Sequence, residues 1–533
     1  MGIMTRPEVK RLPNGGKCWE QEYENFFLKV YLPATPVDGA VNNYGFRAPM
    51  LTVLEEERMS MEEAVAFAEE KGFAKIASAV DSSVLFVYPR CEGGWDKADA
   101  ELYRELIANT KNHPEYKDGI VSITDFFSGE FKGYFIRGAI FRADLYGYGK
   151  SADYIARELL KTIQGEYLWG PGEITPAMCS LERLSIVPAP ERTDIPVMSI
   201  ANSAEINKAF EGFEHLLVKD AADVCADFEA FVKKFKMWVG KVDLEPDFEE
   251  LGMVEEAGCT EVHTSPDNKG RYKDQPTHKV GYFVYYNKGI MDKGPVPLML
   301  GFHGGGDCSM YLTFVSGWWE VCHDHDFLYV AVDDHLEVRP TEVMELIEDL
   351  KKKYRIDEKR IYAGGFSMGS GKTWDLYQEY PLVFAGLAPA SALFPVKENP
   401  FGLSLGDPKL NTEHPVPVFY SGGEASPLPE LPSQAETCLD RVQYVAATNK
   451  LKCRFDVSFA EKDKWEDPFY GIPGDRVEEI PDESRGSVLT VRYYDSEDGV
   501  CRTAFASVSG QQHECRHHSC ENAWKFISQF KRE

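Results

Sequence analysis

The chain has 533 residues, of which 43% are hydrophobic and 13% aromatic, so it is globular and long enough for about two or three domains. Its formal net charge is -28 at pH 7. Such an acidic surface repels phosphate backbones and anionic membranes, which excludes nucleic acids and membranes from the expected partners. The plain role of this charge is solubility.

The amino terminus carries no apolar segment of the length that a secretory signal needs. No run of about 18 apolar residues follows, so no membrane-spanning helix is expected and the sequence predicts a cytoplasmic protein. Its 12 cysteines are scattered, which is typical of free thiols. The cysteine and histidine spacing between Cys501 and Cys520 matches no common zinc site, so neither a metal nor another cofactor is expected.

In chain order, the first half alternates between strand-like and helix-like segments. The expected strands are 26–31, 49–54, 83–88 and 195–200, and the helix expected at 61–72 ends at a glycine. The polar stretch 239–256 then breaks the apolar pattern. We therefore expect two domains, 1–238 and 239–533.

The second half continues with the same alternation. Its expected strands are 282–286, 297–302, 327–332, 360–363, 417–420 and 488–493, and its expected helices are 342–353 and 523–530. Strands that alternate with helices predict the α/β class. Each of the two tandem domains is expected to have a mostly parallel sheet with helices on both faces.

The two halves repeat the same order of elements, which indicates an ancient duplication. The alternative is that two α/β domains share strand patterns through generic physics. Aligning Gly147 with Gly365 puts Gly149 where Ser367 stands, and the acidic segment 55–57 stands where a histidine and three glycines occur in the second half. The first domain is therefore expected to be non-catalytic. It would shape the entrance to the second domain's site or serve in homo-oligomer formation.

The segment Gly365–Gly369 fits the pattern G-x-S-x-G, and its context is the one that a nucleophilic serine requires. A strand ends just before it and a helix begins just after it. On such a tight turn the hydroxyl of Ser367 clears the sheet, and the helix amino end favours developing negative charge. The alternative is a purely structural turn.

A second glycine-rich loop, His303 to Gly306, follows the buried strand 297–302. Glycines let backbone N–H groups come close to a substrate oxygen. We expect Gly304 and Gly305, together with the N–H of Met368, to form an oxyanion hole, and His303 to contact substrate. The alternative is a tight turn without a catalytic role.

A serine nucleophile needs a general base, and His513 is the strongest candidate for it. It follows an expected strand and precedes the last helix. His414 comes too early in the chain, and His517 and His518 remain alternatives with a surface role.

The acid that orients the base is expected after the strand 417–420. Glu424 is the first carboxylate beyond that strand, and Glu430 and Asp463 are the alternatives. Each of them also reads as a solvated surface acid.

Two further features of the sequence bear on ligand binding. The segment Gly371 to Thr373 resembles the end of a phosphate-binding loop, but Phe366 stands where that motif needs a glycine. The aromatic side chain of Trp318 is a candidate for substrate binding, as are those of Trp319 and Trp465. Core packing is the alternative for all three.

These residues resemble the polyhydroxybutyrate-depolymerase and feruloyl-esterase branch of the α/β-hydrolases. The resemblance spans the second domain and rests on 297–306 (PLMLGFHGGG), 354–369 (YRIDEKRIYAGGFSMG) and 510–513 (GQQH). It implies hydrolysis of carboxylic esters through an acyl-serine, without a metal, with Ser367 as nucleophile and His513 as base. The sequence departs from the family at Gln512, where glycine is usual, and at Ser426, where a gapless alignment requires the acidic residue.

The sequence therefore predicts a serine-dependent hydrolase of a small, soluble ester. A peptidase or amidase with the same catalytic groups is an alternative, because the chemistry of both reactions uses one triad. A catalytically inactive protein that uses this fold for binding is another. Active-site labelling and a comparison of ester with peptide substrates distinguish the three.

Overall fold

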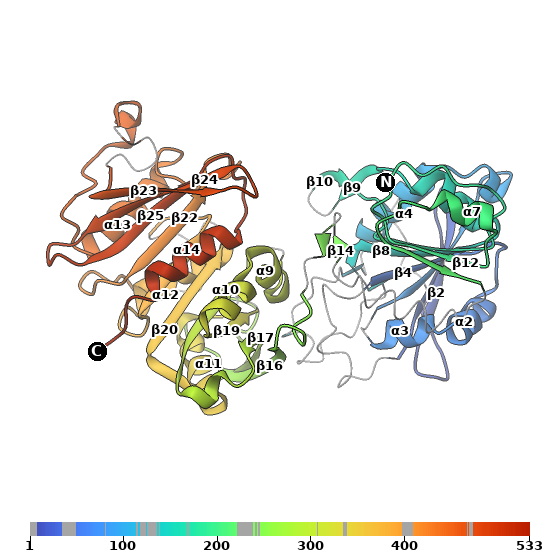
Figure 1. Cartoon of the computed structure of the whole chain (residues 1–533). Helices are drawn as coiled ribbons and strands as arrows, with labels where there is room; N and C mark the ends of the chain where they lie inside the picture. Colours follow the sequence, from blue (N-terminus) through green and yellow to red (C-terminus); the bar gives the residue numbers. More distant parts are fainter. Residues whose placement is uncertain are drawn as a thin grey trace. The chain divides into compact units, whose positions relative to one another are not determined.

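The computed structural model describes residues 8–34, 49–79, 82–112, 116–117, 124, 136–137, 139–167, 170–220, 238–239, 242–243, 246–305, 307–333, 338–396, 409–465, 467 and 473–533. The chain forms two compact units. Unit 1 comprises residues 1–121 and 129–246, and unit 2 comprises 122–128 and 247–533. The division at Pro246 lies beyond the expected boundary at residue 238. Figure 1 shows each unit as a twisted sheet flanked by helices.

Within the described residues, the sheet of unit 2 has ten strands, which are parallel in its centre and antiparallel at both edges. In spatial order they are β16 (Met253–His263), β17 (Thr277–Asn287), β19 (Leu328–Val332), β18 (Val296–Phe302), β20 (Ile356–Phe366), β21 (Gly386–Ala390), β22 (Val418–Gly423), β25 (Cys501–Val508), β24 (Ser487–Asp495) and β23 (Arg476–Asp482). Strands β18, β19 and β21 are buried along their whole length, as parallel strands covered on both faces are.

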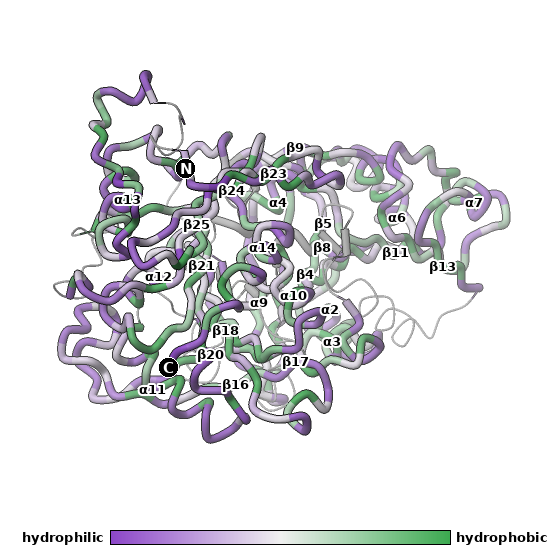
Figure 2. Tube along the Cα trace, turned by 60° about the vertical axis from the view of Figure 1, so that its left-hand side comes forward, coloured by the Kyte–Doolittle hydropathy of each residue, from purple (hydrophilic) through white to green (hydrophobic). Residues whose placement is uncertain are grey.

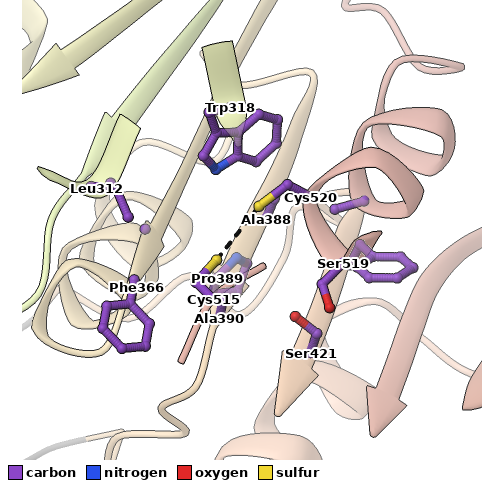
Figure 3. A pocket seen from close by; sticks show the side chains of 13 residues that line it. Leu312, Trp318, Phe366, Ala388, Pro389, Ala390, Ser421, Cys515, Ser519 and Cys520 are labelled. Atoms are coloured by element: carbon purple, nitrogen blue, oxygen red, sulfur yellow. Dashed lines mark hydrogen bonds between the residues drawn. The ribbon is translucent and has the colours of Figure 1, made fainter. Parts of the chain in front are cut away.

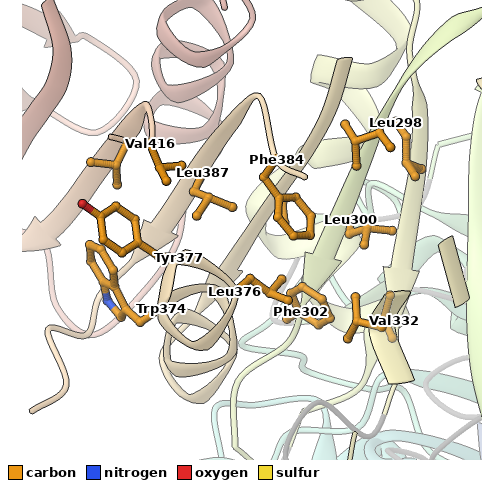
Figure 4. Close-up of a cluster of buried hydrophobic side chains, with 14 of the residues drawn as sticks. Leu298, Leu300, Phe302, Val332, Trp374, Leu376, Tyr377, Phe384, Leu387 and Val416 are labelled. Carbon is orange, nitrogen blue, oxygen red and sulfur yellow. The ribbon is translucent and has the colours of Figure 1, made fainter. Parts of the chain in front are cut away.

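Helices cover both faces of this sheet. They are α9 (Ser309–Ser316), α10 (Trp318–His325), α11 (Pro340–Lys353), α12 (Met368–Glu379), α13 (Glu436–Thr448) and α14 (His517–Ile527), with short 3₁₀ turns at Ile290–Lys293 and Phe459–Lys464. Side chains alternate along a strand, so Leu298 and Leu300 of β18 face α12 in the main core (Figure 4). Tyr329 of β19 points to the opposite face, where Trp318 of α10 stacks on its ring.

The part of unit 1 that the structure describes forms a sheet of nine strands. Their order is β1 (Lys10–Arg11), β2 (Lys17–Glu22), β3 (Phe26–Leu32), β5 (Val84–Pro89), β4 (Pro49–Leu54), β8 (Ala139–Tyr148), β11 (Met178–Glu182), β12 (Val197–Ile200) and β13 (Leu216–Lys219). Its helices are α2 (Met61–Glu70), α3 (Phe73–Ala79), α4 (Ala100–Asn112), α6 (Lys150–Tyr154) with a π-helical continuation at Ile155–Leu159, α7 (Ala204–Ala209) and a 3₁₀ turn at Gly94–Asp96. Small ladders pair β6 (Tyr116–Lys117) with β7 (Ile136–Arg137), β9 (Gln164–Tyr167) with β10 (Gly170–Glu173), and β14 (Trp238–Val239) with β15 (Val242–Asp243).

The two sheets share one topology. The order β3-β5-β4-β8-β11-β12-β13 in unit 1 matches β17-β19-β18-β20-β21-β22-β25 in unit 2, and in each unit an antiparallel strand precedes this series. The register agrees as well, because Leu54 pairs with Gly147 just as Phe302 pairs with Gly365. The repeat of elements inferred from the sequence is thus a repeat of topology. In both units the chain turns from the same central strand into the helix that follows.

The α/β class expected from the sequence is confirmed. Several elements are longer or shorter than expected: the strand expected at 360–363 extends over Ile356–Phe366, and the final helix runs over His517–Ile527 rather than 523–530. Apolar runs reveal only the buried part of an element, so its exposed ends are missed. Figure 2 shows hydrophobic and hydrophilic residues interspersed along the chain, as expected for elements with one buried side. No helix within the described residues is long and apolar enough to cross a membrane.

Candidate active site

Ser367 occupies a sharp turn between β20 and α12. Its backbone has φ +53° and ψ −112°, a conformation that residues with a side chain rarely adopt. Its N–H donates to the carbonyl of Ala390 on the neighbouring strand at 3.0 Å. Helix α12 starts so close to β18 that a Cβ on Gly369 would lie 2.0 Å from the carbonyl oxygen of Phe302. The surrounding structure thus holds Ser367 in a strained turn of the kind that presents a nucleophile.

The imidazole of His513 lies next to this hydroxyl. Its Nε2 is 2.9 Å from Ser367 Oγ, although the two residues are 146 positions apart in the sequence. His513 belongs to the loop between β25 and α14, and the ring of Phe366 packs against it with 4.9 Å between ring centroids. The structure thus brings together the expected nucleophile and the expected base.

The carboxylate that contacts His513 is Glu430. Its Oε1 lies 2.6 Å from His513 Nδ1, and its Oε2 accepts a hydrogen bond from the N–H of Gly423 at 2.6 Å. The side chain is fully buried, with 0% of its surface exposed. A buried carboxylate with these two partners can hold one tautomer of the imidazole and stabilise its protonated form.

The expectation that Glu424 occupies this position is corrected by the geometry. The Glu424 N–H still pairs with the Val508 carbonyl of β25, so its side chain stays over that strand and accepts a hydrogen bond from Ser507 Oγ at 2.9 Å. The chain must first turn back before a carboxylate reaches His513. Asp463, the other alternative, is exposed in the 3₁₀ turn at Phe459–Lys464.

The glycine loop after β18 packs against both neighbours of the serine. A Cβ on Gly304 would lie 2.9 Å from the ring of Phe366, and a Cβ on Gly305 would lie 2.1 Å from Sδ of Met368. Only glycine allows the loop to come this close. The backbone of the loop and the start of α12 therefore adjoin where an oxyanion hole is expected. Gly306, which the sequence pattern also includes, lies outside the described residues.

His303, expected to contact substrate, supports this loop from inside. Its side chain is 9% exposed, with Nδ1 2.8 Å from the carbonyl oxygen of Gly304 and Nε2 3.8 Å from a carboxylate oxygen of Asp333. Burial lowers the pKa of His303, and the charge of Asp333 opposes that shift. This side chain therefore has little surface to offer a substrate.

Trp318 is likewise a buried side chain, 3% exposed, and its ring stacks on Tyr329. This corrects the expectation of a direct substrate contact. Trp318 lines a small cavity together with Phe366 and Cys515 (Figure 3). The cavity has a volume of about 10 Å³, which is room for one water molecule.

Cys515 and Cys520 lie at the edge of the same cavity. Their sulfur atoms are 3.5 Å apart (Figure 3). Burial raises the pKa of the Cys520 thiol well above its ordinary value. Within the described residues, no group of histidine, cysteine and carboxylate side chains has the arrangement of a metal site.

Unit 1 has the same turn without the same chemistry. Gly149, at φ +57° and ψ −127°, has nearly the backbone conformation of Ser367, and its N–H donates to the carbonyl of Glu182 as that of Ser367 does to Ala390. A Cβ on Gly149 would lie 1.8 Å from Oε1 of Glu56. That carboxylate accepts a hydrogen bond from the N–H of Lys150 at 3.3 Å. A carboxylate of unit 1 itself therefore fills the place where unit 2 carries its serine hydroxyl.

The residue before Glu56 is also acidic and is fixed inside unit 1. Glu55 follows β4 as His303 follows β18, and its buried carboxylate is 2.9 Å from Nζ of Lys29. Desolvation raises the pKa of Glu55, and the ammonium group of Lys29 counteracts that rise. This loop cannot act as a flexible, glycine-rich oxyanion loop.

No protein-family model matches the chain. Over 136 residues it is 29% identical to a bifunctional acetylxylan esterase/xylanase from Neocallimastix patriciarum; the match covers 24% of this chain and 19% of that enzyme.

Among solved structures, the chain is similar to an acetyl xylan esterase from Aspergillus awamori, with 11% identity, a TM-score of 0.33 and coverage of 51% of this chain and 98% of that one. A feruloyl esterase module from Clostridium thermocellum complexed with sinapinate shows 11% identity, a TM-score of 0.32 and coverage of 54% and 90%. An S-formylglutathione hydrolase from Staphylococcus aureus shows 14% identity, a TM-score of 0.26 and coverage of 33% and 82%.

Glu430, an alternative to Glu424 in the sequence, owes its place beside His513 to the path of its loop. The signal was weak, because two glutamates follow one strand and only the path of the loop decides between them. The mostly parallel sheet, the strained turn at Ser367 and the chain order serine, glutamate, histidine agree with one architecture. Unit 2 therefore has the fold of the α/β-hydrolases.

Proposed function

We propose that unit 2 is a carboxylic ester hydrolase that works through an acyl-serine intermediate. The observation that carries this proposal is a continuous hydrogen-bonded series, in which Ser367 Oγ is 2.9 Å from His513 Nε2 and His513 Nδ1 is 2.6 Å from Glu430 Oε1. Serine alone is a weak nucleophile and needs a neighbouring base whose orientation is fixed.

In the first step, the hydroxyl of Ser367 attacks the ester carbonyl and His513 takes its proton. Glu430 keeps Nε2 of the imidazole available for this proton and stabilises the imidazolium. The N–H groups of Met368 and of Gly304 or Gly305 donate to the oxyanion. The loss of one such donor costs about 3 kcal/mol of transition-state stabilisation.

The imidazolium then returns the proton to the departing alcohol, which leaves the acyl group on Ser367. In the second half of the reaction, His513 deprotonates a water molecule that attacks the acyl carbon. The acid is released and the serine hydroxyl is restored. All proton transfers pass through His513, so no metal is needed at any step.

The substrate class is a small, soluble ester. Small acetyl and feruloyl esters, the ester types named for the similar proteins, are the first candidates. A panel of p-nitrophenyl acetate, feruloyl and acetylated-sugar esters, with matched anilides, separates esterase from amidase activity.

The decisive variant of the full chain is Ser367→Ala. We expect kcat on p-nitrophenyl acetate to fall by about 10⁴-fold or more, and labelling by a fluorophosphonate probe to disappear. Ser484→Ala, which changes an exposed serine in the turn after β23, is the matched control and should leave both readouts unchanged. Ordinary activity in Ser367→Ala, or a probe adduct on another residue, would overturn the proposal.

A further inference from the structure

The acidic residue next to His513 is carried by a loop rather than by the end of a strand. Strand β22 ends at Gly423, and the chain runs outward and returns before Glu430 reaches the imidazole. The position of such a carboxylate depends on the conformation of the loop that carries it. The contacts that hold this loop therefore bear on the geometry of the base.

The side chain of Gln434 makes those contacts. Its Oε1 accepts hydrogen bonds from the backbone N–H groups of Glu430 at 2.8 Å and of Leu431 at 3.0 Å. Its Nε2 donates to the carbonyl of Glu424 at 3.5 Å, at the other end of the loop. The backbone N–H of Gln434 donates to the carbonyl of Leu431 at 2.9 Å. One half-buried amide thus joins the beginning of the loop to its end.

Other contacts hold Glu430 from the side of the sheet. The buried hydroxyl of Tyr420 donates to the carbonyl of Glu430 at 2.7 Å, and the N–H of Gly423 donates to its carboxylate. The backbone of Glu430 is therefore held on two sides, by Tyr420 from the strand and by Gln434 from the loop. Tyr420 binds the backbone carbonyl of Glu430, whereas Gln434 binds its backbone N–H.

We propose that Gln434 is a positioning residue for the serine, histidine and glutamate of unit 2; this inference rests on the proposed ester hydrolase function. Without the amide, two backbone N–H groups lose their acceptor and the loop can relax. The carboxylate of Glu430 then shifts from Nδ1 of His513. That contact matters most when the imidazole is protonated, so the loss falls on the transition state rather than on substrate binding.

The test uses three variants of the full chain. Gln434→Met has a side chain of similar length without hydrogen bonds, and Gln434→Glu keeps an acceptor for the two N–H groups. Gln529→Met, which changes an exposed glutamine after α14, is the control. The measurements are kcat and KM on p-nitrophenyl acetate and the far-downfield proton resonance of the hydrogen bond between His513 and Glu430.

For Gln434→Met we expect kcat to fall by about 10-fold to 100-fold, as a misplaced catalytic group does, with KM within about twofold of the wild-type value. The downfield resonance should move or broaden. Gln434→Glu should recover kcat to within about threefold, and Gln529→Met should match the wild type.

Three results would overturn the inference: an unchanged kcat and resonance in Gln434→Met, a loss that Gln434→Glu does not recover, or a rise in KM as large as the fall in kcat. If Gln434→Met does not fold by circular dichroism, the shorter amide of Gln434→Asn provides the same comparison. The proposed function fails separately, through activity in Ser367→Ala. The proton resonance still reports the position of Glu430 in that case.

Discussion

At the scale of single residues, two glutamates follow the same strand but have different partners. Glu424 is the first carboxylate after β22, yet its backbone still pairs with β25 and its side chain binds Ser507. Glu430 lies farther along the chain and reaches His513 because the loop turns back. Sequence distance from a strand end is therefore a poor guide to which carboxylate meets the base.

The two glutamates predict opposite outcomes for one chemical change. In Glu430→Gln, an amide replaces the carboxylate at Nδ1 of His513. The neutral amide no longer favours the required tautomer of the imidazole, and it no longer stabilises the imidazolium. We expect kcat on p-nitrophenyl acetate to fall by about 10³-fold to 10⁴-fold. In Glu424→Gln, which keeps an acceptor for Ser507, kcat should stay within about threefold of wild type. The reverse order of effects would show that Glu424 is the acid in solution.

At the scale of elements, the turn from strand to helix is built in two ways. In unit 2, Gly369 has no side chain and α12 starts against the carbonyl of Phe302. In unit 1, Ser151 stands at the matching position, and its hydroxyl donates to the carbonyl of Leu54 at 2.6 Å. The same backbone turn thus tolerates a side chain only where the helix stands farther from the strand.

This difference predicts that Gly369→Ser is destabilising although unit 1 carries serine at the matching position. The new Cβ meets the backbone of Phe302, which cannot move without displacing β18. We expect the free energy of unfolding to fall by about 1 to 3 kcal/mol, the usual cost of overpacking. The measurement is urea unfolding followed by tryptophan fluorescence. Ser151→Gly is the companion variant, and it should lose only about 1 kcal/mol with its hydrogen bond.

At the scale of the whole molecule, two sheets of one topology carry different chemistry. Unit 2 brings a serine, a histidine and a glutamate into one hydrogen-bonded series, and unit 1 places Glu56 against a glycine turn. The duplicated topology preserves the scaffold in both units, because the core depends on many apolar side chains. The polar side chains at the turn are few, so they can differ between the two units while the core is kept.

The chain should therefore react with one equivalent of a fluorophosphonate. Intact-mass measurement is expected to show a single adduct, which peptide mapping places on Ser367. Adding a hydroxyl to unit 1 through Gly149→Ser should not give a second adduct, because Glu56 occupies that space. Two adducts on the wild-type chain would show that unit 1 has a reactive centre of its own.

Much of this protein could be predicted from local patterns. A buried strand followed by a glycine-flanked serine and a helix specifies a turn that few other sequences satisfy, and the same holds for the glycine loop after β18. The α/β class, the repeated order of elements and the candidates Ser367 and His513 all follow from such patterns. Each of these predictions uses patterns formed by residues that are neighbours in the sequence.

Only the tertiary structure decided which acid stands behind the imidazole and what holds it there. Glu430 reaches His513 across 83 positions in the sequence, through a loop whose path is set by hydrogen bonds to Gln434 and Tyr420. No periodicity or motif encodes such a path, because loops lack the regular pairing that makes strands and helices readable. The burial of His303 and Trp318 is likewise a result of packing against distant elements.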